Sequence, residues 1–386
     1  MYNGVMYSRL LTPPQDKSFF LFGPRATGKT TWVRSRMPEA LFVDLLDAEL
    51  FNDLLANPRR LERLIPAGFT GPVAIDEIQK VPELLDEVHR LIESRGLRFA
   101  LTGSSARKLR RGGYNLLAGR ALTLEFFPLT AAELGADFRL DHAIRFGGMP
   151  SVWTESDPRA FLESYVRTYL EEEVRQEGLT RRPADFSRFL EAASFSQGNL
   201  LNISAIARES GVERKVVESY FGILEELRLA YRLPVFSRRS HRRLTGHDKF
   251  YFFDVGIFRT LRPAGPLDAP EEIEGAALET LFLQELMALN ALGGQAYGLH
   301  YWRTAAGQEV DFVLYGPRGL AAFEVQRSSR IDSHALRGLR AFLQDYPMAR
   351  TVLVYGGERE LNEDGIRILP LDQALRELPQ LLGASF

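Results

Sequence analysis

The stretch Gly23-Pro24-Arg25-Ala26-Thr27-Gly28-Lys29-Thr30 decides the N-terminal fold. It matches the complete G-x-x-x-x-G-K-[ST] pattern of a phosphate-binding loop. A short apolar run, Ser18–Phe22, predicts a strand before it, and Thr30–Arg36 predicts a helix after it. Glycines let the backbone curl so that successive N–H groups and the positive end of the helix face an anion. The sequence therefore predicts a strand, loop and helix that bind phosphate, and a chance glycine-rich turn is the disfavoured alternative.

Each residue type in this loop has an expected role. Lys29 is expected to reach the β- and γ-phosphates of a nucleotide, and the Thr30 hydroxyl is expected to bind Mg²⁺. ATP and Mg²⁺ are thus the expected cofactors, although no motif distinguishes ATP from GTP. The expected nucleotide contacts are Gly23, Pro24, Arg25, Ala26, Thr27, Gly28, Lys29, Thr30 and Thr31.

A second motif, Val73-Ala74-Ile75-Asp76-Glu77, is an apolar strand that ends in two carboxylates. Strand ends in such sheets face the ligand crevice. Asp76 is expected to hold the metal, and Glu77 is expected to orient or deprotonate the attacking water as a general base. An acidic turn before the next helix is the alternative, and the phosphate-binding loop upstream favours the catalytic interpretation.

Two further segments carry candidate catalytic residues. In Leu101-Thr102-Gly103-Ser104-Ser105, at the end of an apolar strand, the small hydroxyl residues such as Ser104 either contact the γ-phosphate or the water, or Ser104 or Ser105 caps a helix. Arg120 lies just before an apolar run and either stabilises phosphate charge on a neighbouring subunit, as an arginine finger, or forms a surface ion pair. The residues alone leave both alternatives open.

Composition sets the class of protein. The chain has 386 residues, of which 45% are hydrophobic and 25% charged, as in globular proteins of roughly two or three domains. A formal charge of -2 argues against a uniformly basic nucleic-acid-binding surface, and the absence of cysteine excludes disulfides and thiolate zinc sites. No apolar run is long enough to span a bilayer and no signal peptide is visible, so a soluble cytoplasmic protein is expected.

The pattern along the chain predicts three regions. From Ser18 to about Pro128, short apolar runs alternate with amphipathic segments, which predicts a parallel sheet with helices on both faces. The expected strands are 18–22, 40–45, 72–75, 98–102 and 121–125. Residues 158–233 are mostly helical in pattern, and residues 275–386 return to mixed strand and helix.

Together these motifs resemble the bacterial and archaeal AAA+ ATPases that end in domain of unknown function 4143. The resemblance implies Mg²⁺, catalytic-base and finger roles for Asp76, Glu77 and Arg120, and a homo-oligomer, expected as a hexameric ring, because a finger acts on a neighbour. Ala26 departs from the glycine or glutamine common in relatives. The motifs that carry the resemblance are 23–30, 44–47, 74–79, 101–105, 118–120, 127–130, 147–150, 307–312 and 323–326.

The middle region resembles a winged helix. Residues 201–227 predict two amphipathic helices joined by a turn with glycine, and two strands are expected at 229–233 and 249–253. A basic loop between the strands is suited to DNA phosphates, although winged helices also bind proteins and basic runs are often solvated. The candidate DNA contacts are Arg214, Lys215, Arg238, Arg239, Arg242 and Arg243.

The C-terminal region resembles the PD-(D/E)XK nuclease core, in which two carboxylates bind Mg²⁺ and a lysine assists. Glu279 on an expected helix, Asp311 on one strand and Glu324 on the next supply the carboxylates. Gln326 stands where the lysine is expected, and Arg327 is expected to point away because strand side chains alternate. A fold kept for scaffolding or nucleic-acid binding is therefore favoured over a nuclease.

The expected fold class is α/β: a P-loop AAA+ core with a parallel sheet at residues 1–135, a helical and winged-helix domain at 136–262, and a restriction-endonuclease-like α/β domain at 263–386. The leading hypothesis is an oligomeric ATPase that binds or remodels DNA. An ATP-regulated, metal-dependent DNA nuclease in defence or repair is one alternative, and a nucleotide-dependent switch that binds a partner protein is another.

Overall fold

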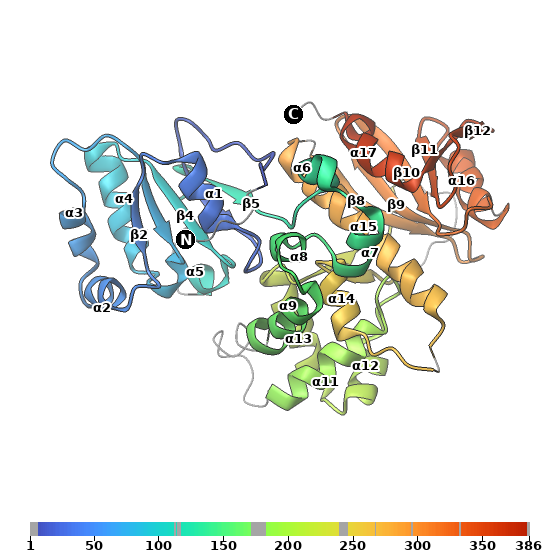
Figure 1. Ribbon diagram of the computed structural model, residues 1–386, viewed down its shortest axis with the longest axis horizontal. Coiled ribbons are helices and arrows are strands. Elements are labelled where there is room, and N and C mark those ends of the chain that lie inside the picture. The colour runs from blue at the N-terminus through green and yellow to red at the C-terminus, as the bar shows by residue number, and fades with distance from the viewer. Residues whose placement is uncertain are drawn as a thin grey trace. The chain divides into compact units, whose positions relative to one another are not determined.

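A computed structural model describes residues 7–111, 113, 117–170, 183–238, 246–266, 268–294, 296–331 and 333–383. Contacts divide the chain into two compact units. One comprises residues 11–127 with 226–228, and the other comprises the N-terminal segment up to residue 10, residues 128–225 and residues 229–386. We describe each unit by itself, in the colours and labels of Figure 1.

The first unit is built on a five-stranded sheet in the order β2-β3-β4-β1-β5. All neighbouring strands are parallel, and β4 lies between the strand that precedes the phosphate-binding loop and the strand that ends at Asp76. The parallel sheet expected from the alternating pattern is confirmed, with each strand end within one residue of its predicted position. The strands are β1 (Ser18–Phe22), β2 (Leu41–Asp44), β3 (Val73–Asp76), β4 (Phe99–Gly103) and β5 (Ala121–Glu125).

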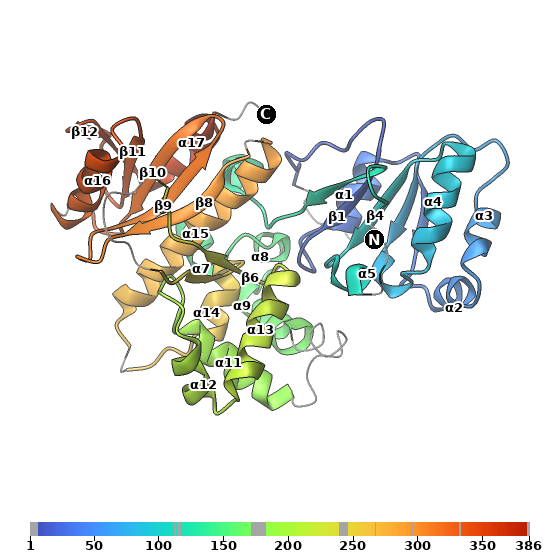
Figure 2. The same ribbon diagram turned by 180° about the vertical axis from the view of Figure 1, so that it is seen from behind.

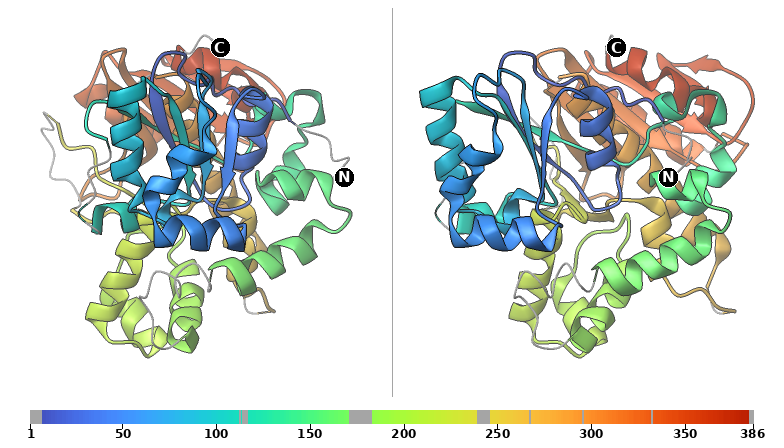
Figure 3. Two further views of the ribbon diagram at one scale, coloured as in Figure 1. Left: turned by 90° about the vertical axis from the view of Figure 1, so that its left-hand side faces the viewer. Right: turned by 60° about the vertical axis from the view of Figure 1, so that its left-hand side comes forward.

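Helices cover both faces of this sheet (Figure 3). Because side chains alternate along a strand, Phe19 of β1 meets Trp32 of α1, with ring centroids 6.2 Å apart. Phe20 points the other way and packs in a core with Val88 of α4. The helical segments are α1 (Lys29–Arg36), α2 (Ala48–Ala56), η1 (Pro58–Arg60), α3 (Leu61–Leu64), η2 (Ile78–Lys80), α4 (Leu84–Arg95) and α5 (Arg107–Arg111).

The second unit begins with helices and one antiparallel strand pair, β6 (Ala230–Leu233) with β7 (Lys249–Phe252). An aromatic core joins them, in which Phe221 of α13 meets Phe189 of α11 and Phe250 of β7. Three helices followed by a hairpin fit the winged-helix prediction, which stays a prediction. The helical segments are α6 (Ala131–Leu134), η3 (Gly135–Asp137), α7 (Leu140–Phe146), α8 (Pro150–Thr154), α9 (Pro158–Ser164), η4 (Tyr165–Leu170), α11 (Pro183–Ser194), α12 (Ile203–Ser210), α13 (Arg214–Glu226) and α14 (Val255–Leu261).

A six-stranded mixed sheet in the order β12-β13-β11-β10-β9-β8 completes this unit (Figure 2). Leu339 and Phe342 of α16 pack on one face, and Phe282 of α15 contacts Phe312 and Phe323 on the other. Helices thus cover both faces, and α17 lies beside α15. The elements are α15 (Pro270–Leu292), β8 (Gly298–Arg303), β9 (Glu309–Gly316), β10 (Gly319–Val325), α16 (Ser333–Asp345), β11 (Arg350–Tyr355), β12 (Leu361–Glu363), β13 (Ile366–Pro370) and α17 (Leu371–Leu382).

The motif Gly147-Gly148-Met149-Pro150 has a structural role in the second unit. Asp254 is fully buried at the start of α14 and accepts hydrogen bonds from the N–H groups of Gly148, at 2.8 Å, and Gly256, at 2.8 Å. Burial raises the pKa of Asp254 to about 6. Gly147 has φ +79°, and a Cβ there would lie 2.2 Å from Asp254 Oδ1. The turn between α7 and α8 therefore requires glycine.

We expect Gly147→Ala to lower the free energy of unfolding by about 2–4 kcal/mol, because it adds left-handed strain and disturbs a buried carboxylate. Gly222→Ala is the control, since Gly222 lies in α13 with nothing within 4 Å of its ideal Cβ. That substitution should stabilise α13 by roughly 0.5–1 kcal/mol. Thermal unfolding measures both changes, and equal midpoints for Gly147→Ala and the parent chain would contradict this account.

Candidate functional site

The phosphate-binding loop connects β1 to α1 in the first unit. Lys29 is nearly buried, and its Nζ donates to the carbonyl oxygens of Gly23, at 2.8 Å, and Pro24, at 2.9 Å. Ala26 has φ +58°, a left-handed conformation that costs a residue with a side chain about 1–2 kcal/mol. This explains why glycine suits that position. The loop encloses the Lys29 amine, as a cradle for phosphate requires.

Asp76 links the loop to the centre of the sheet. Its Oδ2 accepts the Thr30 hydroxyl at 2.7 Å, and its Oδ1 accepts the Thr102 hydroxyl. The side chain is 2% exposed, so both contacts lie in a protected place. A hydroxyl and a carboxylate held together are ligands suited to Mg²⁺, so Thr30 and Asp76 can hold the ion. The prediction about Asp76 overlooked Thr102, whose place at the end of β4 was the available signal.

Glu77 is held in an unusual backbone conformation, with φ +60°, directly after β3. Such conformations cluster at functional sites. Gln79 is nearly buried, and its Nε2 donates to Glu77 Oε2 and lies 3.5 Å from Ser104 Oγ. A Cβ on Gly103 would lie 2.3 Å from Gln79 Oε1, so the glycine makes room for this amide. Gln79 therefore fixes one oxygen of the Glu77 carboxylate.

Two neighbouring serines after β4 have different surroundings, one at the start of a helix and one beside the proposed catalytic residues. Ser105 Oγ accepts the N–H of Arg107 at 3.3 Å, at the start of α5. Ser104 instead lies beside Gln79, near the carboxylate of Glu77. Ser105 thus takes the role at the helix start, while a catalytic role for Ser104 stays a prediction.

Arg120 lies at the surface of the first unit. Its Nε forms an ion pair with Glu93 Oε1, and the two side chains are 40% and 56% exposed. The hydrogen bond and charge of Arg120 lower the pKa of Glu93. Within one chain Arg120 therefore forms the surface ion pair, and its action on a neighbouring subunit stays a prediction.

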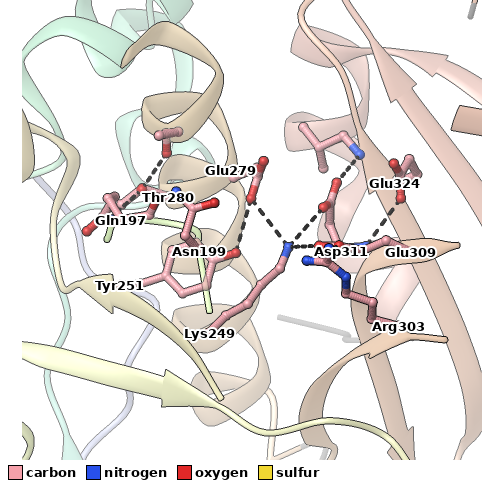
Figure 4. Close-up of polar contacts among 12 residues, drawn as sticks. Gln197, Asn199, Lys249, Tyr251, Glu279, Thr280, Arg303, Glu309, Asp311 and Glu324 are labelled. Atoms are coloured by element: carbon pink, nitrogen blue, oxygen red, sulfur yellow. Dashed lines mark hydrogen bonds and ion pairs between the residues drawn. The ribbon is translucent and has the colours of Figure 1, made fainter. Parts of the chain in front are cut away.

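A second polar site lies in the C-terminal part of the other unit, around Lys249 of β7 (Figure 4). This lysine is 3% exposed. Its Nζ lies 2.5 Å from Glu309 Oε1, 3.3 Å from Asp311 Oδ1 and 3.8 Å from Glu279 Oε2. We call Lys249 with Glu279, Glu309, Asp311 and Glu324 the lysine cluster. The structure thus brings together the three predicted carboxylates and adds a cation that sequence reasoning missed.

Backbone and tyrosine contacts fix the carboxylates of the lysine cluster. Tyr251 donates its hydroxyl to Glu279 Oε2 at 3.1 Å. Asp311 Oδ2 accepts the N–H of Val325 at 3.0 Å, and the Asp311 N–H donates to Glu324 Oε2 at 3.2 Å. The pairing of β8 with β9 contains a bulge. One residue separates His300 from Trp302 in β8, whereas two residues separate their partners Val310 and Val313 in β9. A bulge of this kind re-aims side chains, here beside Asp311.

Burial and mutual repulsion shift the ionisation of the lysine cluster. Burial, with the nearby Asp311 charge, raises the pKa of Glu279 to about 8, and the same two causes raise the pKa of Glu324 well above its ordinary value. Burial also raises the pKa of Asp311. Burial opposes the ammonium, yet Tyr251 and the carboxylates raise the pKa of Lys249 well above its ordinary value. The ammonium is the charge that these acids need.

Gln326 does not join the lysine cluster, although the nuclease-like pattern placed it there. It lies just beyond β10, and its Nε2 donates to the carbonyl oxygen of Arg330 at 3.1 Å. Arg327 pairs instead with Glu274, at 2.6 Å. Among the described residues, no group of three or more His, Cys, Asp or Glu side chains is suited to hold a metal ion. Asp311 instead contacts the Lys249 ammonium.

The candidate DNA contacts are only partly described. Arg214 forms an ion pair with Glu218 at 3.1 Å along the exposed face of α13, and Lys215 beside it is exposed. The Arg238 guanidinium lies 4.8 Å from the centre of the Tyr315 ring. Arg239, Arg242 and Arg243 lie outside the described residues. The described part of α13 thus presents mixed charge, and DNA contact stays a prediction.

Three parts of the chain match known family models. Residues 15–135 match the family model described as an AAA domain. Residues 137–268 match domain of unknown function 8612, and residues 274–374 match domain of unknown function 4143. The chain thus carries an AAA domain followed by domain of unknown function 4143, the architecture that the motifs predict. An AAA domain supports nucleotide binding and an ATPase-type enzyme in general.

Two mycobacterial proteins are similar to most of this chain. Uncharacterized proteins of Mycobacterium bovis and Mycobacterium tuberculosis are each 29% identical over 368 residues, which is 92% of this chain and 80% of theirs. A Vibrio cholerae crystal structure, of protein VC1899, matches at 13% identity over 95% of this chain and 97% of its own. Its TM-score of 0.23 is too low to indicate a shared fold. None of these names assigns an activity.

No helix in the described part of the chain has the length and apolar character needed to cross a membrane.

The geometry around Gln79 predicts the effect of removing its side chain. We expect Gln79→Ala to lower ATP turnover about tenfold, a part of the roughly 10²–10⁴-fold that general acid–base catalysis contributes, with little change in the KM for ATP. Gly103→Ala should do the same, because its methyl group would displace the amide. The double variant should be no worse than either single one. Steady-state kinetics of all three, with Glu49→Gln of α2 as an exposed control, measure this.

A raised KM with unchanged kcat would show instead that Gln79 serves nucleotide binding. Additive losses in the double variant would show that Gly103 and Gln79 act separately.

Proposed function

We propose that this protein is a Mg²⁺-dependent ATPase that acts as a homo-oligomer and couples ATP binding and hydrolysis to the binding or remodelling of DNA. One observation carries the ATPase part. The Thr30 hydroxyl and the Asp76 carboxylate are hydrogen-bonded at 2.7 Å, one residue before Glu77 and beside a complete phosphate-binding loop. This contact supports the proposed roles of Thr30 and Asp76 as a metal-binding pair, next to the proposed base and phosphate cradle.

The chain's own residues have separate tasks in this proposal. Lys29 exchanges the carbonyl oxygens of Gly23 and Pro24 for phosphate oxygens when nucleotide binds. Thr30 and Asp76 hold Mg²⁺, which supplies positive charge against the phosphates. Glu77 orients a water molecule and accepts its proton. Gln79 donates a hydrogen bond to Oε2 of Glu77 and so helps to orient this carboxylate.

The exposure of Arg120 supports the proposed oligomer. Its guanidinium pairs with Glu93 at the surface, with 40% of the side chain exposed. An arginine supplied to a neighbouring subunit has to be accessible in this way, and such a residue contributes 10³–10⁵-fold to turnover in related phosphoryl transfers. A closed ring, expected as a hexamer, gives every site one such neighbour.

DNA is the proposed macromolecular partner. Lys215 is exposed on α13, and Arg238 begins the run of arginines between β6 and β7. Lysine and arginine bind DNA by neutralising phosphates, which makes the affinity depend on salt. These residues support backbone contact and give no reason to expect that bases are read.

Three variants separate the steps of the ATPase. Lys29→Ala should lose nucleotide binding, because the phosphates lose their ammonium partner. Glu77→Gln should bind ATP normally but turn over at least about 100-fold more slowly. Arg120→Ala should bind ATP and lose turnover in the assembled protein. Equilibrium binding of a fluorescent ATP analogue and phosphate release measure these effects, and normal turnover of Lys29→Ala and Glu77→Gln would refute the ATPase.

Duplex or branched DNA should stimulate turnover of the wild-type protein, and DNA binding should weaken as salt rises. Lys215→Ala should weaken binding by a similar factor for all sequences and flatten the salt slope by about one phosphate contact. Fluorescence anisotropy over a salt series measures both, with Lys17→Ala in the first unit as the control. DNA binding that is indifferent to salt would contradict phosphate contact. Slow turnover, with a protein partner bound only in the ATP state, would favour the nucleotide-dependent switch.

A further inference from the structure

The lysine cluster contains more acids than the nuclease-like pattern predicts. Four carboxylates meet there, from Glu279, Glu309, Asp311 and Glu324, and two cations approach them. Lys249 contacts three of the acids, and Arg303 pairs with Glu309 at 3.2 Å. Acids packed so closely either stay protonated or are neutralised by a nearby positive charge, and Lys249 offers such a charge.

Lys249 is placed to be that charge. It comes from β7, far from the other members in sequence, and its side chain is only 4% exposed. Its Nζ lies between Glu279 of α15 and the Glu309–Asp311 end of β9, with the Tyr301 ring centre 5.7 Å away (Figure 4). An ammonium in this position makes three ion pairs at once.

A divalent ion has little room at the same acids. Asp311 turns Oδ1 to Lys249 and gives Oδ2 to the N–H of Val325. One oxygen of Glu324 accepts the Asp311 N–H, and Tyr251 occupies Glu279 Oε2. Both oxygens of Asp311, and one oxygen each of Glu279 and Glu324, thus already have hydrogen-bonding or ionic partners, and the ammonium would repel a second cation.

We propose that the Lys249 ammonium is the resident cation of the lysine cluster. It takes the place of a divalent metal, so the cluster fastens β7 to α15 and β9 and is not a metal-dependent nuclease site. Gln326 fits this role, because a chain that keeps its ammonium on β7 needs no lysine on β10.

The wild-type arm of the test needs no change at Lys249. Mn²⁺ is titrated into the full chain without nucleotide, and bound ion is counted by the loss of the free-ion electron paramagnetic resonance signal. We expect the wild type and Asp311→Asn to bind the same number of Mn²⁺ ions. Loss of one ion in Asp311→Asn would overturn the proposal. So would DNA cleavage with Mn²⁺ that depends on both Asp311 and Lys249, because that result defines a metal nuclease with a lysine supplied by β7.

The second arm removes the ammonium and keeps its aliphatic bulk. Lys249→Met should gain one bound Mn²⁺ ion per chain, and Mn²⁺ should raise its unfolding midpoint but not that of the wild type. The double variant Lys249→Met/Asp311→Asn should lose this gain. Lys215→Met, an exposed lysine on α13, is the matched control and should bind like the wild type. A folded Lys249→Met chain with no gained ion would overturn the proposal.

Discussion

The carboxylate of Asp76 is the point on which the first unit depends. It is buried at the end of β3 and joined to two hydroxyls, one from the start of α1 and one from β4. A buried carboxylate without partners is costly, so both contacts hold its neighbours in place. One side chain therefore sets the distance between the phosphate-binding loop, the strand that leads to Glu77 and the strand that leads to Ser104.

In the second unit, α15 likewise contains buried polar side chains that need partners. This helix is apolar on most sides, yet it carries buried polar groups to three neighbours. Thr280 accepts the Gln197 amide at 2.7 Å, Glu279 meets Lys249, and Glu285 accepts the N–H of Ala131 at 2.7 Å. Burial raises the pKa of Glu285 to about 8, as it does that of Glu279, but Glu285 accepts a backbone N–H whereas Glu279 lies beside an ammonium. Glu279 also lines a pocket. The neighbouring acids Glu309 and Asp311 contact the ammonium of Lys249.

Local patterns predicted the elements of the first unit and the loop residues, because strand alternation and the spacing of Gly23, Gly28 and Lys29 depend on near neighbours in sequence. Gln79 and Lys249 escaped prediction for the opposite reason. The role of Gln79 depends on Gly103 across the sheet, and that of Lys249 on acids 30 to 75 residues away. The nuclease-like pattern predicts a lysine two residues after Glu324, but the ammonium beside these acids belongs to Lys249 of β7. The only sequence feature that could have drawn attention to Lys249 is the rarity of lysine, since the chain has six.

The two polar sites differ in what neutralises their acids, and this difference separates their chemistry. The partners of Asp76 are neutral hydroxyls, which reorient easily, so its negative charge stays available to a metal that arrives with a nucleotide. The partner of Asp311 is a covalently attached ammonium that cannot leave. A site whose charge is satisfied from within the chain has nothing left to offer a divalent cation, whereas a site held by hydroxyls alone keeps its affinity for one. In the proposed roles, the same residue type, a buried aspartate at the end of a strand, supports turnover in the first unit and rigidity in the second.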